Sequence, residues 1–174
     1  MKSVPHVVLS FVALGWLVVR TANGSEPRFA VQTINAESTY SACAVMDVNH
    51  DGRLDIVCGG SWYEAPTWTT HFIRDVEMIR GRYDDYAHLP LDLNGDGWTD
   101  YVSANWRSRS IYWVQHPGPS VGTDSVEGWK KHLVDVPGHM ETARLADVDG
   151  DGQLDILPNC VRTSDGEPFA GWWE

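Results

Sequence analysis

Three copies of a nine-residue loop constrain this sequence more than any other feature. Residues 47–55 read DVNHDGRLD, residues 92–100 read DLNGDGWTD and residues 147–155 read DVDGDGQLD. Each copy has an oxygen-bearing side chain at positions one, three, five and nine and a glycine at position six. Glycine permits a sharp turn there that a β-carbon would disfavour. Such a loop directs alternating oxygen atoms toward one point, as a bound cation requires.

The loops also hold almost all of the chain's excess negative charge. The 174-residue chain has a formal net charge of −11, and without its ten loop aspartates the charge would be about −1. Carboxylates crowded into short loops repel one another unless a positive charge lies among them. The acidic balance also argues against a nucleic-acid partner, since phosphate binding requires clustered Lys and Arg.

Calcium is the cation that best fits these loops, because it takes about six to eight oxygen ligands, whereas zinc and copper prefer His or Cys. We predict that each loop provides four side chains and the backbone carbonyl of position seven. The predicted ligands are Asp47, Asn49, Asp51, Arg53 and Asp55, then Asp92, Asn94, Asp96, Trp98 and Asp100, then Asp147, Asp149, Asp151, Gln153 and Asp155, with Arg53, Trp98 and Gln153 contributing only carbonyls.

An EF-hand is a poor match to these loops. Its loop needs a bidentate Glu at position 12. Position 12 is Cys58, Ser103 or Pro158 here, and the flanking runs read as strands. Dockerin and thrombospondin-type repeats also want an acidic residue at that position, so they fail for the same reason.

The similarity of the three regions extends beyond the loops. Each loop lies between two short runs rich in β-formers, and an aromatic strand follows. In the first two repeats a fourth strand with a W-x-x-H pattern comes next. Sustained helical periodicity is absent after the N-terminus. The expected strands are 41–46, 56–60, 61–64 and 68–73, then 86–91, 101–105, 110–115 and 129–134, then 142–146, 156–160 and 169–174, with a degenerate fourth-strand copy at 29–34. Residues 116–128 are predicted to form a surface loop.

Four short strands per repeat predict an all-β fold of β-propeller blades, each a four-stranded antiparallel sheet. The expected blades are about 40–76, 84–136 and 141–174. The third lacks a fourth strand, and a closed propeller needs at least four blades. We therefore predict a partial propeller of about three blades, whose open blade edges could support self-association.

The N-terminus predicts export. Residues 7–19, VVLSFVALGWLVV, are an apolar run that is too short to span a bilayer comfortably, and small residues follow it up to Gly24. We predict a signal peptide at 1–24 and a mature chain at 25–174 with no membrane span, located in the periplasm, outside the cell or on its surface. An uncleaved membrane anchor is the alternative.

The mature chain has an odd number of cysteines, Cys43, Cys58 and Cys160. At most one internal disulfide is then possible. Cys43 and Cys58 flank the first loop and could pair across a hairpin, but the pair does not recur in the other repeats. We therefore favour buried free thiols.

The acidic ninth position followed by Ile-Val, Tyr-Val or Ile-Leu, within a blade-sized repeat, resembles the FG-GAP/VCBS repeat family. That family includes the calcium-loaded blades of integrin α-chain propellers and many exported bacterial proteins. The resemblance covers roughly residues 28–174. It implies that calcium braces the loop hairpins on one face, and that the opposite face and channel mouth bind partners.

Two functions remain open from sequence. The first is a non-catalytic, exported binding or adhesion module for an extracellular protein or carbohydrate. The second is the N-terminal part of a carbohydrate-active lyase, because the fungal aldos-2-ulose dehydratases carry a similar propeller. Residues that could do such chemistry follow the fourth strands or lie on one connection of the second repeat: Arg80, Arg82, Tyr83, Asp84, Asp85, His88, His139 and Glu141, with Asn105, Trp106, Arg107 and Arg109.

We favour the binding module and assign no catalytic residue, since charged loop residues are usually solvated. His71 and His132, in the W-x-x-H elements, are expected to pack on Trp68 and Trp129 rather than to bind a ligand.

Overall fold

The computed structural model describes residues 29–122, 128–162 and 166–174. Within them the regular structure is β, apart from one 3₁₀ turn at Gly118–Ser120, which confirms the predicted all-β fold. The chain divides into two compact units, Met1–Thr33 and Ile34–Glu174, and every strand of the described residues lies in the second. The predicted signal peptide, 1–24, falls outside the described residues. None of the helices in the described part is long and apolar enough to cross a membrane.

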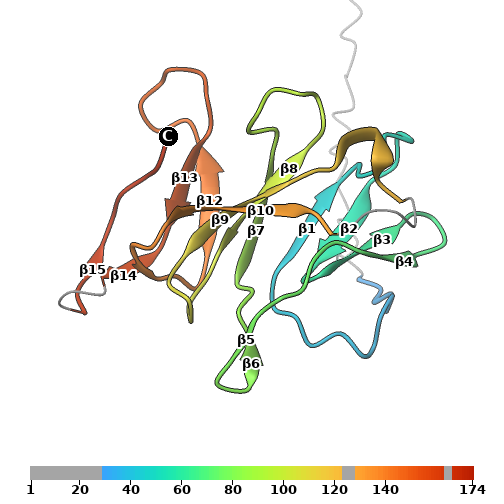
Figure 1. Cartoon of the computed structure of the whole chain (residues 1–174), viewed down its shortest axis with the longest axis horizontal. Coiled ribbons are helices and arrows are strands. Elements are labelled where there is room, and N and C mark those ends of the chain that lie inside the picture. Colours follow the sequence, from blue (N-terminus) through green and yellow to red (C-terminus); the bar gives the residue numbers. More distant parts are fainter. Residues whose placement is uncertain (1–28, 123–127, 163–165) are drawn as a thin grey trace, which may run out of the picture. The chain divides into compact units, whose positions relative to one another are not determined.

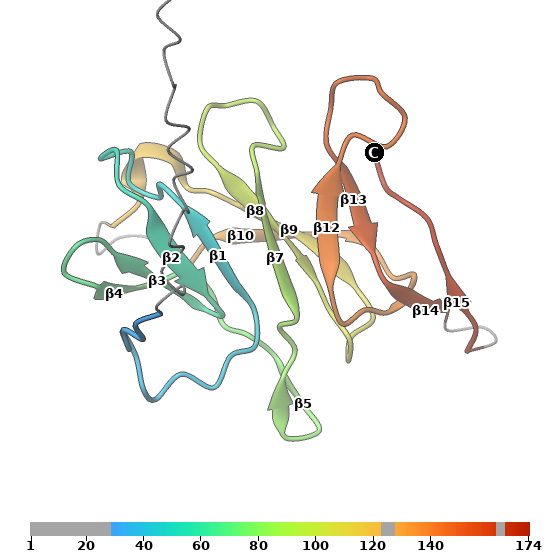
Figure 2. The same ribbon diagram turned by 180° about the vertical axis from the view of Figure 1, so that it is seen from behind.

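The first sheet has the strand order predicted for a propeller blade. Strands β1 (Cys43–Met46), β2 (Asp55–Cys58), β3 (Ser61–Glu64) and β4 (Thr69–Phe72) pair antiparallel in that order (Figures 1 and 2). In β1, exposed and buried residues alternate, as expected of a strand with one face against a core. Val57 and Trp62 face each other across β2 and β3, and both are buried.

The second sheet repeats this order with longer strands. It contains β7 (Ala87–Leu91), β8 (Asp100–Ala104), β9 (Ile111–Gln115) and β10 (Lys130–Asp135). All five residues of β8 are buried, so both faces of this strand are covered. Tyr101 belongs to the core shared with the first sheet, whereas Val102 belongs to the core shared with the third repeat. The period-two alternation of a strand produces this division.

The third repeat is less regular than predicted. Strands β12 (Ala143–Ala146) and β13 (Asp155–Pro158) pair as expected, but only Trp173 of the strand predicted at 169–174 pairs with β13, through one bridge to Ile156. Gly171 weakens a strand at that point, because glycine loses more entropy on ordering and offers no side chain to pack. The chain instead forms a separate sheet of β11 (Gly138–His139), β14 (Cys160–Arg162) and β15 (Pro168–Phe169).

Two further predictions of strands differ from the structure. Residues 29–34 form no strand, and the side chains of Phe29 and Val31 are exposed. A fourth strand needs a third strand to pair with, and none of the described residues pairs with this segment. Conversely, the connection between the first two sheets contains a hairpin that was not predicted, β5 (Met78–Ile79) and β6 (Arg82–Tyr83).

The first strands of the three repeats lie side by side, since β7 is in contact with both β1 and β12. This is the arrangement of neighbouring propeller blades. One core fills the space between the first and second sheets, and another lies between the second sheet and the third repeat. Burying each large side chain stabilises the fold by roughly 1.5–3 kcal/mol. The two cores are Ala44, Met46, Val48, Val57, Trp62, Ile73, Tyr101, Val114 and Trp129, and Ala87, Leu89, Val102, Ala104, Ile111, Met140, Ala143, Ile156 and Cys160.

Candidate metal centres

The three aspartate loops connect the first strand of each repeat to the second, and all three fold in the same way. In the first loop the backbone N–H of Gly52 donates to Asp47 Oδ2 at 2.9 Å. The N–H of Asp51 donates to Asn49 Oδ1 at 3.1 Å, and the N–H of Arg53 donates to Asp51 Oδ1 at 2.9 Å. The other loops repeat this set with donors Gly97, Asp96 and Trp98, and Gly152, Asp151 and Gln153.

The sixth-position glycines adopt the backbone conformation that their spacing predicts. Gly52, Gly97 and Gly152 have φ of 84°, 87° and 92°. A β-carbon at any of them would meet no atom within 4 Å. The requirement for glycine is therefore the left-handed backbone and not lack of space.

The third loop brings three carboxylates together. One oxygen from each of Asp147, Asp149 and Asp151 lies within 4.8 Å of the others, and all three residues are exposed. Two oxygens bound to one calcium ion at about 2.3–2.6 Å lie no more than about 5 Å apart. The geometry of this triad therefore fits calcium.

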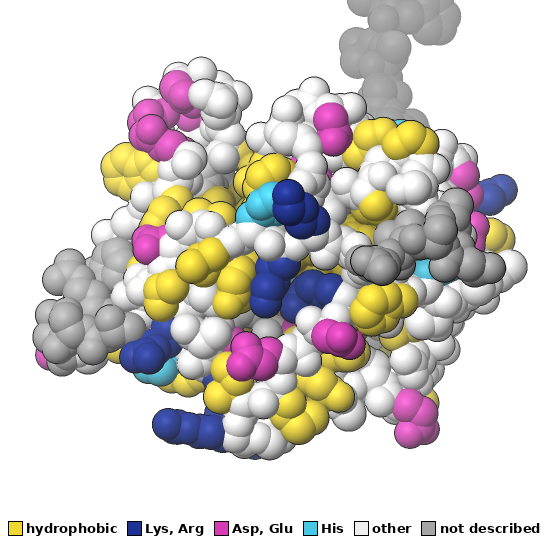
Figure 3. Space-filling model, in the orientation of Figure 1, with side chains coloured by type: hydrophobic (Ala, Val, Ile, Leu, Met, Phe, Trp, Pro, Cys, Tyr) yellow, Lys and Arg dark blue, Asp and Glu magenta, His cyan; other side chains and the backbone are white. Residues whose placement is uncertain are grey.

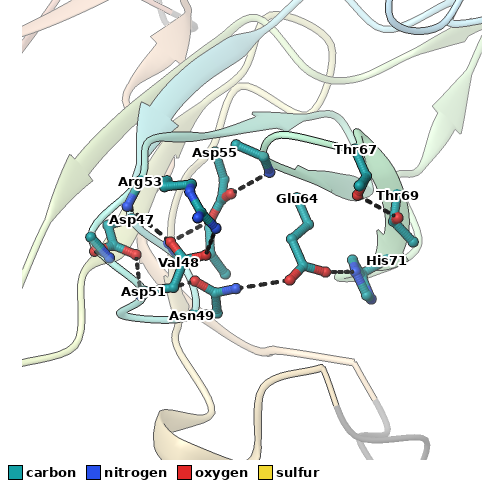
Figure 4. A network of polar contacts seen from close by, with 12 residues as sticks. Asp47, Val48, Asn49, Asp51, Arg53, Asp55, Glu64, Thr67, Thr69 and His71 are labelled. Atoms are coloured by element: carbon teal, nitrogen blue, oxygen red, sulfur yellow. Dashed lines mark hydrogen bonds and ion pairs between the residues drawn. The ribbon is translucent and has the colours of Figure 1, made fainter.

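In the first loop a side-chain network orients the amide of Asn49 (Figure 4). Its Nδ2 donates to Glu64 Oε1 at 3.1 Å, and Glu64 Oε2 contacts His71 Nε2 at 2.8 Å. This leaves Asn49 Oδ1 directed at the loop backbone. In the second sheet, His132 Nε2 similarly contacts Gln115 Oε1 at 3.0 Å. The histidines of the W-x-x-H elements thus hold the end of the third strand.

The predicted aromatic partners of these histidines were wrong. His71 stacks on Trp62 with ring centroids 4.2 Å apart, and His132 stacks on Trp113 at 4.4 Å, instead of on Trp68 and Trp129. Trp68 and Trp129 precede the strands that carry the histidines, and Trp68 has a positive φ of 58°, so the strand does not place the Trp of each element on its own His. The cross-strand neighbour does, because Trp62 pairs with His71 and Trp113 with His132.

The ninth-position aspartates are buried and act as clamps. Asp55 accepts hydrogen bonds from the N–H of Val48 at 3.0 Å and from the N–H of Ala65 at 2.8 Å, so it joins the loop to the end of β3. Asp100 does the same in the second sheet, with the N–H groups of Leu93 at 3.2 Å and His116 at 2.7 Å.

Burial raises the pKa of Asp55 and of Asp100 above the usual range, although the N–H donors oppose this shift. Asp155 accepts from the N–H of Val148 at 2.8 Å. A carboxylate has about four lone-pair positions, so each of these aspartates keeps acceptor capacity for a metal ion. The spacing of the ninth-position aspartates in the loops predicts that they bind metal, but nothing in the sequence indicates that they also accept these backbone hydrogen bonds.

Sequence reasoning missed His116, which was placed in a surface loop. Its side chain is buried, Nε2 contacts the carbonyl of Val48 at 2.9 Å, and the N–H of Gly118 donates to Nδ1 at 2.9 Å. Only the neutral ring can make both contacts, with Nε2 donating. Burial lowers the pKa of His116 to about 4. His116 also stacks on Trp98 at 4.9 Å, and Trp98 stacks on His50 at 3.8 Å, so aromatic rings join the first two loops.

The residues considered for catalysis separate into several places. Asp85 and His88 form a buried pair at 2.5 Å, and Asp84 is buried with its carboxylate bonded to two backbone N–H groups. Glu141 is exposed. Arg82 and Tyr83 line one pocket, and a second pocket is lined by Ile79, Arg80, Trp106, Arg107, Arg109 and His139.

Cys43 and Cys58 lie directly opposite each other on β1 and β2, with Sγ atoms 3.1 Å apart and no disulfide bond. The prediction of buried thiols is confirmed for Cys58 and Cys160. It is wrong for Cys43, which is exposed because it lies at the outward-facing start of β1.

Sequential antiparallel sheets, each with an aspartate loop between its first two strands, define a propeller-like repeat protein. Residues 92–157 match the family model of the FG-GAP-like repeat, from the first aspartate of the second loop to β13. This confirms the predicted resemblance over that stretch. A search of curated proteins finds no match to the chain.

Proposed function

We propose that this protein is an exported, calcium-binding β-propeller repeat protein that serves as a binding or adhesion module. The observation that carries the calcium assignment is the triad of Asp147, Asp149 and Asp151, whose oxygens lie within 4.8 Å of one another. The FG-GAP-like repeat match supports it, since such repeats often bind calcium and are typically extracellular. The apolar run at 7–19 supports export.

In each loop the residues at positions one, three, five and nine would provide side-chain oxygens, and position seven its carbonyl. Bound calcium would supply the positive charge that offsets the crowded carboxylates. Asp147 and Asp151 accept hydrogen bonds from backbone N–H groups, which supports the turn of the loop. Ion binding then adds stability to the folded state by mass action.

An extracellular protein or carbohydrate is the proposed partner. The aspartate loops occupy one end of the strands, which leaves the opposite end for a ligand. The exposed outer strands β4 and β10 are the edges through which two copies could associate. Catalysis is not proposed, because Asp84, one of the acid–base candidates, has both carboxylate oxygens bonded to backbone N–H groups.

The calcium assignment is tested by calorimetric titration of the purified mature chain with calcium. We expect binding with dissociation constants of roughly 10⁻⁴–10⁻³ M or tighter. The triple variant Asp51→Ala, Asp96→Ala and Asp151→Ala should lose it. As a matched control, Asp75→Ala, Glu77→Ala and Glu141→Ala removes three exposed carboxylates outside the loops and should bind as the parent does. Equal calcium uptake by the loop variant and the control would refute the assignment.

A further inference from the structure

A pocket rich in arginine lies at the end of the second sheet away from its aspartate loop. It has a volume of about 280 Å³. Arg80 comes from the turn of the β5–β6 hairpin, Arg107 and Arg109 come from the connection between β8 and β9, and His139 lies on β11. In Figure 1 the hairpin points away from the aspartate loops, and Figure 3 shows dark blue and cyan side chains meeting at the lower left.

Among the residues that the structure describes, the three guanidinium groups have no anionic partner. Among the described residues, no carboxylate lies within 4.0 Å of Arg80, Arg107 or Arg109. Arg107 Nε is buried and makes no hydrogen bond to any described residue. A buried donor without a partner costs free energy unless a ligand satisfies it. Three arginines with no carboxylate partner among the described residues are also unexpected in one pocket of a chain with a net charge of −11.

Two of these arginines occupy backbone conformations that favour other residues. Arg80 has φ of 53° and Arg109 has φ of 63°. Arg80 and Gly81 form a two-residue hairpin turn with both φ positive, where Asn-Gly is the favoured pair. Left-handed backbone is unfavourable for a residue with a β-carbon. Arginine at both positions therefore opposes stability, as residues kept for binding often do.

Hydrogen bonds from neighbouring residues fix the backbone of the connection that carries Arg107 and Arg109. The N–H groups of Arg107 and Ser108 each donate to the buried carboxylate of Asp84 at 2.8 Å. Asn105 adds a side-chain hydrogen bond to the carbonyl of Ser110 at 3.1 Å. The guanidinium groups thus extend from a fixed backbone, and a ligand would meet a preorganised site.

Trp106 and His139 give the pocket a second kind of surface. Their rings lie 4.8 Å apart, and Nδ1 of His139 donates to the carbonyl of Trp106 at 2.6 Å. In the neutral ring, Nε2 then remains as an acceptor for a ligand hydroxyl. The indole offers a flat apolar face beside the cations.

We propose that this pocket binds a small ligand in which a carboxylate is attached to a ring. Arginine forks match carboxylate geometry, and the ring would lie against Trp106. Sugar acids and aromatic acids share this chemistry. The acceptor on His139 favours the sugar acid, which carries hydroxyl groups. The inference does not depend on calcium, so its outcome is separate from that of the loop variants.

The test is calorimetric titration of the mature chain with four probes: galacturonate, benzoate, acetate and galactose. We expect galacturonate to bind at least tenfold more tightly than acetate or galactose, because only it combines the anion with the hydroxylated ring. Benzoate binding as tightly as galacturonate would also support the ring carboxylate and would assign the site to aromatic acids. No binding of either acid, or acetate binding as tightly as galacturonate, would overturn the proposal.

Variants separate binding from folding. Arg80→Asn and Arg109→Asn place a residue suited to left-handed backbone, so the melting temperature should stay equal or rise. Each should weaken galacturonate binding by roughly tenfold to a hundredfold, since a hydrogen bond to a charged group contributes about 1.5–3 kcal/mol. Arg82→Gln is the matched control, because Arg82 is on the same hairpin but lines the other pocket. Unchanged binding by both asparagine variants would contradict the proposal.

Discussion

The first and second sheets share one frame and differ at the turn between their second and third strands. In the first sheet that turn is Gly59-Gly60, and a β-carbon on Gly59 would lie 2.0 Å from the ring of Tyr40. In the second sheet the corresponding connection is residues 105–110, which carries the arginines of the basic pocket. In the first sheet the side chain of Tyr40 fills the space beside the turn, whereas in the second sheet the longer connection lines a pocket. Strand pairing thus preserves the blade, and the connection can vary to provide a site.

Two other equivalent positions distinguish these sheets. The second N–H donor to the clamping aspartate belongs to Ala65 in the first sheet and to His116 in the second. The other position lies three residues before the end of the first strand of each sheet. There Cys43 pairs with Cys58 in the first sheet, and His88 pairs with Ser103 in the second. The first sheet therefore has a redox-sensitive pair, and the second has a pH-sensitive residue at its clamp.

The largest effect should come from removing the clamps that both sheets share. Asp55→Ala or Asp100→Ala leaves two backbone N–H donors without their acceptor, which should lower the free energy of unfolding by about 4 kcal/mol, at about 1–3 kcal/mol for each donor. Asp155→Ala removes the acceptor of Val148, and we expect a loss of about 1–2 kcal/mol. Urea denaturation in EDTA measures these losses without the contribution of metal.

Asp100 accepts from two N–H groups, from Leu93 and His116, whereas Asp155 accepts from that of Val148. Equal losses of unfolding free energy for Asp100→Ala and Asp155→Ala would show that the hydrogen bond from His116 adds no stability. Losses for the first two variants that appear only when calcium is present would assign these residues to the metal alone.

How much of this comparison could be predicted from sequence depends on whether a feature is local. The loops and the four strands of each of the first two sheets follow from local sequence patterns and turn residues, which act over a few neighbours. The clamp, the burial of His116 and the basic pocket depend on side chains brought together across strands. His116 is 68 residues from Val48, the residue whose carbonyl it contacts, so no local pattern marks it. Similarly, 169–174 has the composition of one strand, but Phe169 of β15 pairs with Cys160 and Trp173 forms a separate bridge with Ile156.

Oxidation should distinguish the first sheet from the second. The Sγ atoms of Cys43 and Cys58 are 3.1 Å apart, and the hydrogen bond from Cys43 lowers the pKa of Cys58 to about 7. Oxidised glutathione should therefore convert the two thiols to a disulfide, with release of two reduced glutathione molecules. A loop of this length should gain about 3 kcal/mol in unfolding free energy.

Intact mass should fall by about 2 Da on forming one disulfide, and urea denaturation before and after oxidation gives the stability change. Cys160→Ser is the control and should form the same bond, whereas Cys43→Ser should show neither change. A stable mixed disulfide with glutathione on Cys58, in place of the internal bond, would mean that the two strands hold the thiols apart.

The smallest effect should be a pH dependence that arises in the second sheet alone. The pKa of His116 in the folded protein is about 4, below the usual value of about 6.5. The unfolded chain therefore binds more protons between these values, and stability should fall as the pH drops from about 6.5 toward 4. At pH 5 the loss should be about 2 kcal/mol relative to pH 7. Protonation would also break the hydrogen bond from the Gly118 N–H to Nδ1.

The raised pKa values of Asp55 and Asp100 act in the opposite direction. A carboxyl that is easier to protonate in the folded protein makes that protein more stable as the pH falls. The measurement is therefore a difference: urea denaturation in EDTA at pH 5 and pH 7 for the parent protein and for His116→Gln, which cannot titrate. The parent should lose about 2 kcal/mol more than the variant over this interval. Equal pH dependence in the two proteins would show that His116 reaches water when protonated, and that its burial against Trp129 and Trp98 imposes no lasting cost.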